Sequence, residues 1–167
     1  FVDELRENYV GRNTGTQLAR LIDAGSWATE VTAPQSETTH FVQNISTPIL
    51  DQITDNISDV ERLQLAAPFF GSPDSVATIV DRIDPQTCDL LIDEGTTHVD
   101  LEAVVTSIEC ATSVRRLDYP TSRWIHGKFM CFLGNDWSGC LYGSPNHTGR
   151  ALLKTADDGN LEAGILR

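Results

Sequence analysis

The feature that most constrains this chain is a change of apolar spacing that repeats between residues 60 and 119. Short apolar runs over residues 60–68, 87–92 and 113–119 predict strands, whereas apolar residues three and four apart in the two intervening segments predict helices. The first helix is capped by Ser72-Pro73-Asp74 and runs to about Ile83, and the second spans residues 100–108. Strands that alternate with helices are typical of an α/β layer with parallel pairing.

The segments on either side extend this layer. Residues 41–57 carry apolar side chains at helical spacing, which predicts a helix. Ser46-Thr47-Pro48 within this segment can start the helix proper, with Thr47 as the cap and Pro48 at the first helical position. Residues 124–133 and 139–143 predict two strands joined at a Gly134-Asn135-Asp136 turn, which makes a hairpin. One or two helical turns over residues 150–154 and a last strand over residues 161–166 follow.

We therefore expect an α/β fold with a mixed, largely parallel sheet flanked by helices. The chain of 167 residues is long enough for one domain with a buried core. We place that domain at residues 41–167 and treat residues 1–40 as an N-terminal extension or linker. The chain begins with Phe1 instead of Met and ends on an apolar run, so we expect it to be a piece of a longer protein.

The charge is strongly acidic, with 24 acidic and 12 basic side chains and a net charge of −12. Ten of the basic residues are Arg and two are Lys, a balance that resembles proteins of salt-loving archaea. A generic nucleic-acid binder would carry the opposite sign. No apolar run reaches the roughly 18–20 residues of a membrane helix, and no signal peptide is visible, so we expect a cytoplasmic protein without a membrane partner.

The four cysteines do not form a metal-binding pattern. They include no C-x-x-C pair and no zinc-finger spacing, so they indicate no zinc site. Our expectation for the chain as a whole is neither a metal nor another cofactor. Cys131 and Cys140 could face each other across the hairpin. Buried reduced thiols are the expected state, with a disulfide as the alternative.

His126 and Lys128 are the first candidates for chemistry. Residues two apart on a strand point to the same face, so this imidazole and this ammonium group would lie side by side. Such a pair suits a nucleophile or an acid/base that faces a phosphate, and the alternative is a surface strand with two polar residues.

Two later segments should meet this pair. Ser144 and Asn146 follow the returning strand of the hairpin, where a hydroxyl and an amide can donate to phosphate oxygens. Glu162, in the predicted last strand, can orient His126 if that strand lies beside the hairpin. Taken alone, each segment is equally compatible with an ordinary turn or an exposed edge.

Together these residues resemble a known family. His126-Gly127-Lys128, Gly143-Ser144-Pro145-Asn146 and Asn160-Leu161-Glu162 are similar to the H-x-K, G-S-x-N and N-x-E motifs of the phospholipase D superfamily. Residues 67–70 also resemble the end of that family's first core strand and the loop after it. The resemblance covers roughly residues 45–167, which corresponds to one half-unit of the family.

The resemblance implies phosphodiester cleavage without a metal. His126 would form a phosphohistidine, Lys128, Ser144 and Asn146 would hold the phosphate oxygens, and Glu162 would orient His126. A matching histidine would come from a homodimer or from a second half-unit of a longer chain. We also assign substrate binding to Arg123, His147 and Arg150, although Arg115, Arg116, Arg123 and Arg150 could equally pair with the many acids.

Three functions follow as hypotheses. We favour a nuclease-type or DNA-processing phosphodiesterase, with nucleic acid as the expected substrate. The family's motif has an Asp seven residues after its histidine, where this chain has Leu133; the nearest acid is Asp136. This departure favours a catalytically degenerate domain for nucleic-acid binding or dimerisation as the alternative. A phospholipase is the third hypothesis, supported by Phe69, Phe70 and Trp124.

Overall fold

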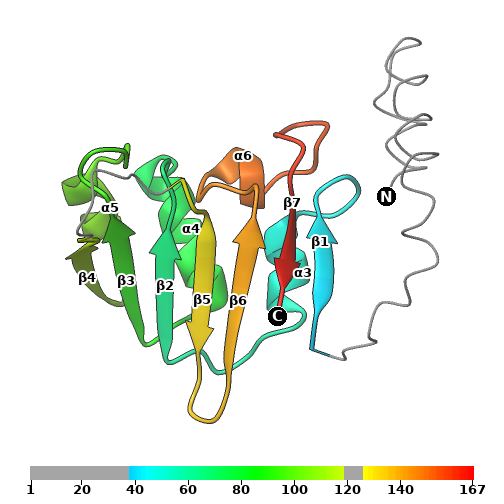
Figure 1. Ribbon diagram of the computed structural model, residues 1–167, viewed down its shortest axis with the longest axis horizontal. Coiled ribbons are helices and arrows are strands. Elements are labelled where there is room, and N and C mark those ends of the chain that lie inside the picture. The colour runs from blue at the N-terminus through cyan, green and yellow to red at the C-terminus, as the bar shows by residue number, and fades with distance from the viewer. Residues whose placement is uncertain (1–37, 119–125) are drawn as a thin grey trace. The chain divides into compact units, whose positions relative to one another are not determined.

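A computed structural model describes residues 38–118 and 126–167 of the chain (Figure 1). These residues form one seven-stranded sheet with four helices. The strands are β1 (His40–Gln43), β2 (Arg62–Ala66), β3 (Thr87–Ile92), β4 (Ala111–Arg116), β5 (Phe129–Leu133), β6 (Ser138–Gly143) and β7 (Ala163–Leu166). The helices are α3 (Ile49–Thr54), α4 (Pro73–Ile83), α5 (Leu101–Ser107) and α6 (Gly149–Leu152).

The sheet has the strand order β1-β7-β6-β5-β2-β3-β4. Strands β2, β3 and β4 pair in parallel, and the other four pairings are antiparallel. The expected mixed α/β fold with flanking helices is confirmed. The expectation of a largely parallel sheet is wrong, because most strand pairings are antiparallel. The hairpin adds β5 antiparallel to β2, and β7 pairs antiparallel with both β6 and β1.

The helices cover one face of the sheet, behind it in the view of Figure 1. Apolar side chains from this face of the central strands pack against the buried stripes of α3, α4, α5 and α6. The core includes Leu63, Leu65, Leu90, Met130, Phe132 and Leu141 from the sheet, and Ile49, Leu50, Ile79, Val80, Val104 and Leu152 from the helices. No helix in the described part of the chain has the length and apolar character needed to cross a membrane.

The elements with strong local signals form where the sequence predicts them. Strand β3 occupies Thr87–Ile92, and α4 ends at Ile83. Ser72 is the N-cap of α4 and accepts a hydrogen bond from the Ser75 amide, while Pro73 occupies the first turn. Asp100 caps α5 in the same way by accepting from the amide of Ala103.

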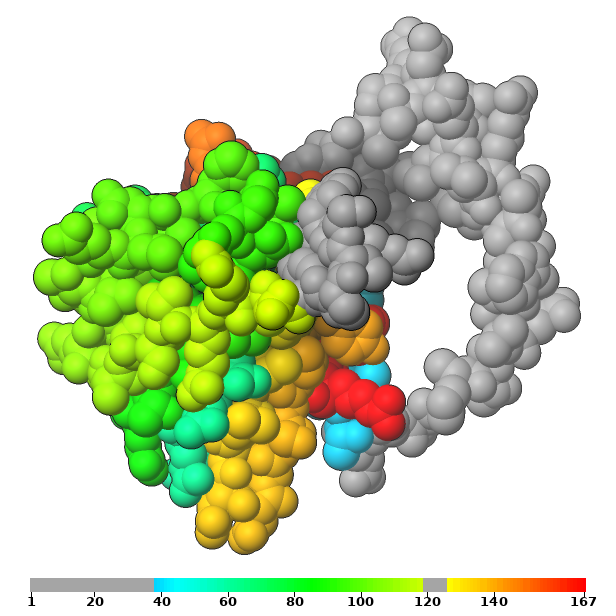
Figure 2. Space-filling view, turned by 60° about the vertical axis from the view of Figure 1, so that its left-hand side comes forward, coloured from blue at the N-terminus to red at the C-terminus, as the bar shows by residue number. Residues whose placement is uncertain are grey.

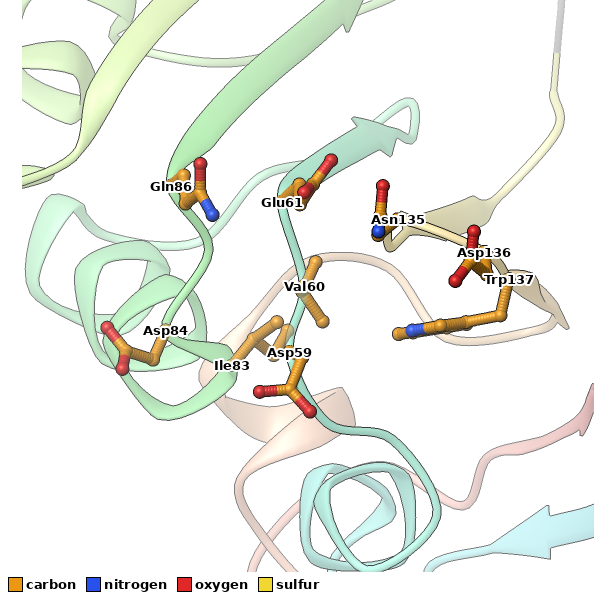
Figure 3. A pocket seen from close by; sticks show the side chains of 9 residues that line it. All are labelled: Asp59, Val60, Glu61, Ile83, Asp84, Gln86, Asn135, Asp136 and Trp137. Carbon is orange, nitrogen blue, oxygen red and sulfur yellow. The ribbon is translucent and has the colours of Figure 1, made fainter.

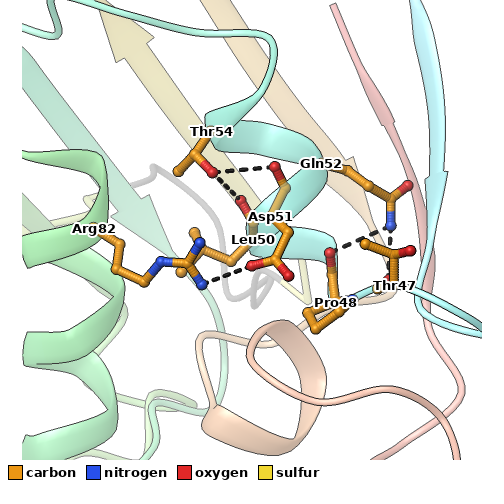
Figure 4. Close-up of polar contacts among 7 residues, drawn as sticks. All are labelled: Thr47, Pro48, Leu50, Asp51, Gln52, Thr54 and Arg82. Carbon is orange, nitrogen blue, oxygen red and sulfur yellow. Dashed lines mark hydrogen bonds and ion pairs between the residues drawn. The ribbon is translucent and has the colours of Figure 1, made fainter.

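The predicted helix over residues 41–57 is wrong in its first half. Residues 40–43 form β1, which pairs with β7 at the edge of the sheet. Helix α3 begins only at Ile49, with Pro48 rather than Thr47 at the N-cap. Pro48 has no polar side chain, so no side chain caps α3. The side-chain nitrogen of Gln52 donates to the carbonyls of Thr47 and Pro48 and holds the turn before the helix (Figure 4). An ion pair of 2.7 Å between Asp51 and Arg82 joins α3 to α4.

The hairpin of β5 and β6 forms as expected and projects beyond the neighbouring strands (Figures 1 and 2). Strand β5 begins at Phe129, so His126 and Lys128 precede it instead of lying within it. Cys131 and Cys140 are directly opposite each other, with their sulfur atoms 3.4 Å apart as free thiols. The expected facing position across the hairpin is confirmed, whereas the expected burial holds for Cys88 and not for Cys110, Cys131 and Cys140, which are half-buried. Burial raises the pKa of Cys131 to about 12.

Candidate phosphodiester site

Three adjacent strands bring the candidate residues to one edge of the sheet, which here means the edge formed by the ends of the strands and not an outer strand. Strand β5 begins there, β6 ends there and β7 begins there, because the three run antiparallel. The amide of Gly143 donates to the carbonyl of Lys128 at 3.4 Å, and the amide of Ser144 donates to the carbonyl of Ala163 at 3.0 Å. The segments around Lys128, Ser144 and Glu162 are therefore neighbours, although they come from three parts of the sequence.

Ser144 and Glu162 form the best-defined part of this edge. The Ser144 hydroxyl donates a short hydrogen bond to Oε2 of Glu162 and accepts one from the amide of Ala163 at 3.1 Å. The Asn160 amide nitrogen donates to Oε1 of Glu162 at 3.3 Å. Glu162 is 8% exposed. A buried carboxylate is costly unless hydrogen bonds satisfy both oxygens, and Ser144 and Asn160 provide them.

Asn44 is a site residue that the sequence analysis missed. Its fully buried side chain accepts from the amide of Glu162 at 2.8 Å and donates to the carbonyls of Asn160 at 2.6 Å and Lys154 at 3.1 Å. Its main chain also accepts from the amide of Ala156 and donates to the carbonyl of Glu162. This one residue at the end of β1 fixes the segment that carries Glu162. The sequence carries no clear signal of it, because Asn44 follows Gln43 and stands close to Ser46 and Thr47 in a segment of mixed polarity.

Lys128 and His126 lie ahead of β5. The Lys128 side chain is half-buried, with its Nζ 3.5 Å from the carbonyl oxygen of His126. The His126 side chain is exposed. Because both residues precede the strand, the alternation of a regular strand does not place them on one face. Lys128 is instead brought to the edge through the bond from Gly143 to its carbonyl.

Asn146 completes the set of expected phosphate ligands at this edge. Its loop turns tightly, with the Thr148 amide donating to the Asn146 carbonyl at 2.8 Å. The side-chain oxygen of Asn146 is buried and has no hydrogen-bond partner among the residues that the structure describes. This oxygen accepts hydrogen bonds, so a phosphate oxygen would be held by the side-chain nitrogen of Asn146 and not by this atom.

His147 is buried between two strands. Its Nε2 lies 3.1 Å from the carbonyl oxygens of both Ala66, at the end of β2, and Phe129, at the start of β5. Both contacts are acceptors, so Nε2 carries the proton and Nδ1 is unprotonated. Burial lowers the pKa of His147 to about 4, although the two carbonyl contacts act in the opposite direction. His147 thus holds its loop to the sheet as a neutral side chain, and substrate contact by it stays a prediction.

The arginines have different positions. Arg115 pairs with the buried Asp89 at 3.1 Å, and Arg116 pairs with Glu94, so the ion-pairing alternative holds for both. Burial tends to raise the pKa of Asp89, but hydrogen bonds from Arg115 and Gln64 and the nearby positive charges outweigh it and lower the pKa. Arg150 is exposed on α6, where its substrate role stays a prediction. Arg123 and Trp124 lie outside the described residues.

A cavity of about 490 Å³ lies at the opposite edge of the sheet, near the start of β2 and the turn of the hairpin (Figure 3). Four acids line it: Asp59, Glu61, Asp84 and Asp136. Their charges would repel a phosphate. Asp136 lies in the turn beyond β5, three residues after Leu133, and lines this cavity instead of occupying the position of the family's acid. Within residues 38–118 and 126–167, no three His, Cys, Asp or Glu side chains are grouped to hold a metal ion.

Comparison with solved structures identifies proteins of similar fold. Yeast tyrosyl-DNA phosphodiesterase matches with a TM-score of 0.50 at 13% sequence identity, over 77% of this chain and 31% of that chain. A histidine-to-alanine mutant of the same yeast enzyme matches over the same shares with a TM-score of 0.49 and 12% identity. The fold is phospholipase D-like. No protein-family model and no curated protein sequence matches the chain.

The similarity to the yeast enzyme covers only part of that enzyme, so it is informative about the fold alone. The chain spans about a third of the length of the yeast enzyme, and at 13% identity the likeness concerns the fold alone. The fold therefore agrees with the resemblance found in the motifs, while activity and substrate depend on the residues at the site.

Proposed function

We propose that this chain provides one half-site of a metal-independent phosphodiesterase that processes nucleic acid. The observation that carries the proposal is that the segments of Lys128, Ser144, Asn146 and Glu162 are neighbours at the edge of the sheet from which His126 emerges. These residues supply a cation, a side-chain amide donor and a buried carboxylate to which the Ser144 hydroxyl donates, which together suit a phosphate and a nucleophilic imidazole. The phospholipase D-like fold, shared with a yeast DNA phosphodiesterase, supports the same assignment.

The first proposed step is attack by a ring nitrogen of His126 on phosphorus. A P–N bond forms while the bond from phosphorus to the leaving oxygen breaks, and the leaving oxygen takes a proton from a general acid. Lys128 and Asn146 would hold the non-bridging oxygens, whose negative charge grows as the nucleophile attacks. Glu162, held by Ser144 and Asn160, would accept a hydrogen bond from the other nitrogen of His126 and fix its orientation.

The second proposed step is hydrolysis of the phosphohistidine. Water attacks phosphorus, a P–O bond forms, the P–N bond breaks, and the group that served as the acid takes the proton of the water. This acid/base would be a second histidine, from a homodimer or from another half-unit of a longer chain. A dimer that joins two His126 side chains at one phosphate satisfies the requirement.

The net charge of −12 determines the salt concentration at which nucleic acid can bind, and it leaves the proposed chemical steps unchanged. At low salt the charge repels a polyanion, but at about 1 M salt the screening length falls to roughly 3 Å. Contacts at the site then dominate over the field of the whole protein. Activity on nucleic acid is therefore expected to be higher in molar salt than in dilute buffer.

A catalytically degenerate domain is the second candidate. Leu133, at the end of β5, takes the place of the family's acid, and Asp136 lines a cavity at the far edge of the sheet. In this alternative, the same edge would bind a phosphate backbone or form a dimer without cleaving a bond. Hydrolysis by the wild-type protein separates the two candidates.

The test is hydrolysis of bis(p-nitrophenyl) phosphate and of a labelled oligonucleotide in molar salt with EDTA. We expect wild-type turnover, and a loss of at least about 1,000-fold in kcat for His126→Ala, because the nucleophile is removed. Quenching under alkaline conditions should trap a phosphorylated protein that loses its label in acid, as a phosphohistidine does.

His40→Ala is the matched control, because His40 lies on β1 and does not belong to the proposed site. It should keep wild-type turnover. The catalytic proposal is wrong if the wild-type protein cleaves neither substrate, or if His126→Ala is as active as the wild type. In the first case, tight binding of the intact oligonucleotide would support the degenerate domain.

A further inference from the structure

Phe69 is a large apolar side chain that the fold leaves exposed. It follows β2 in an extended segment whose side chains alternate in direction, and it is 45% exposed while Phe70 is 8% exposed. Phe70 points inward and lies with its ring centroid 5.3 Å from that of the buried His147. The core therefore accounts for Phe70 but not for Phe69.

Phe69 stacks on a second exposed ring. The rings of Phe69 and His98 are parallel within 8°, with centroids 5.2 Å apart. Main-chain contacts between Pro68–Phe70 and the loop before α5 fix the pair, beginning with a parallel bridge from Phe69 to His98. The His98 amide donates a hydrogen bond of 2.7 Å to the Pro68 carbonyl, and the Phe70 amide donates one of 3.3 Å to the His98 carbonyl. Single exposed apolar residues are common, but a pre-ordered, stacked aromatic pair is a platform for another flat ring.

The platform lies beside the phosphate ligands. Phe70 forms a bridge to His147, and the Gly71 amide donates to the His147 carbonyl at 2.8 Å. Residues 98, 69–70 and 146–147 are thus three neighbouring extended segments at the same edge of the sheet. Neighbouring strands are about 5 Å apart, so the platform lies roughly 5–10 Å from the segment of Asn146. A nucleoside attached to a phosphate at Asn146 can reach this far.

The acids near the platform are engaged in other contacts. Glu94 pairs with Arg116, and Asp100 caps α5. Asp93 accepts hydrogen bonds of 3.0 Å from the Gly95 amide and the Thr96 hydroxyl. These contacts offset part of the negative charge that an approaching nucleic acid would meet.

We propose that the Phe69–His98 stack is a nucleobase subsite, which makes unpaired, single-stranded nucleic acid the substrate of the phosphodiester site. This inference rests on the proposed function for the position of the phosphate. An unpaired base can lay its face on the exposed side of the stack, whereas a base in a duplex is already stacked on both sides. Aromatic stacking tolerates every base, so binding is expected to show little sequence preference.

The test compares a fluorescent single-stranded oligonucleotide with an abasic one of the same length, measured by anisotropy in the His126→Ala background. Both probes carry the same phosphates, so the ratio of their dissociation constants isolates the bases. We expect about ten-fold tighter binding of the probe with bases, and a ratio close to one for Phe69→Ala. Phe69→Trp should restore the preference, because an indole also offers a flat ring.

Phe41→Ala is the matched control, since Phe41 is 53% exposed on β1 and lies away from the platform. It should keep the full ratio. The inference is overturned if Phe69→Ala keeps the preference for bases, or if a blunt duplex loses as much affinity from this substitution as the single strand. Hydrolysis of bis(p-nitrophenyl) phosphate by the protein with His126 intact is measured in parallel. If the protein does not hydrolyse this substrate but still binds the probe with bases more tightly than the abasic probe, the result counts against the proposed function and not against the subsite.

Discussion

Replacing Asn44 by alanine is expected to lower the free energy of unfolding by about 3–5 kcal/mol. The substitution leaves the amide of Glu162 and the carbonyls of Asn160 and Lys154 without the bonds that the Asn44 side chain makes with them. A buried polar group left unsatisfied costs about 1–3 kcal/mol, and water entering the vacated space recovers part of that cost. Urea unfolding at neutral pH measures the difference.

Asn56 provides a matched control for this experiment. Its side chain also donates to a main-chain carbonyl, that of Gln52 at 2.8 Å, but in an exposed position. Asn56→Ala should therefore cost less than about 0.5 kcal/mol. Equal losses for the two variants would contradict the role assigned to Asn44. A folded Asn44→Ala protein should also lose activity toward phosphodiesters, because the segment that carries Glu162 loses its attachment.

Lowering the pH from 7 to 4 is expected to remove about 3 kcal/mol of stability through His147 alone. Burial places the pKa of the folded state at about 4, below the ordinary value of 6.5 that applies to the unfolded chain. Between these two values the unfolded state binds more protons than the folded state, so stability falls as the pH falls. A difference of about 2.5 pKa units corresponds to about 3 kcal/mol.

His147→Gln isolates this effect from the titration of the carboxylates. Glutamine retains an uncharged nitrogen that can donate toward the carbonyls of Ala66 and Phe129, but it does not titrate. Urea unfolding of both proteins at several pH values between 7 and 4.5 should show a steeper loss of stability for the wild type than for the variant as the pH falls. Parallel curves would show that His147 does not control the acid sensitivity.

The sequence predicts those parts of the fold that local signals determine. Strand β3 and helix α4 have a clear period and, for α4, an explicit cap at Ser72. Strand β1 was misassigned because its four residues are stabilised by pairing with β7, at the other end of the domain. A helical spacing over residues 41–57 contains no information about that partner, and tertiary pairing overrides the local preference.

The residues of the candidate site can also be divided into those that local motifs predict and those that depend on tertiary contacts. The motifs select Lys128, Ser144, Asn146 and Glu162 as candidates, because their residue types and their order along the chain resemble those of the phospholipase D superfamily. Asn44 and the stack on His98 were not predictable, because each depends on which loops the sheet brings together. His147 illustrates a further limit, since sequence alone does not distinguish a histidine that lines a pocket from one buried against main-chain carbonyls.

The bond between Asn44 and Glu162 also has a consequence for how the domain folds. It joins residues 118 positions apart, and β1 pairs with β7 across a similar separation. Contacts between distant segments form slowly, because a long loop must close before they contribute. Strands β2, β3 and β4 can assemble from neighbouring segments, but Glu162 reaches its position only after the last strand has docked. During synthesis from the N-terminus, we therefore expect the candidate site to be completed last, on a sheet that is already largely formed.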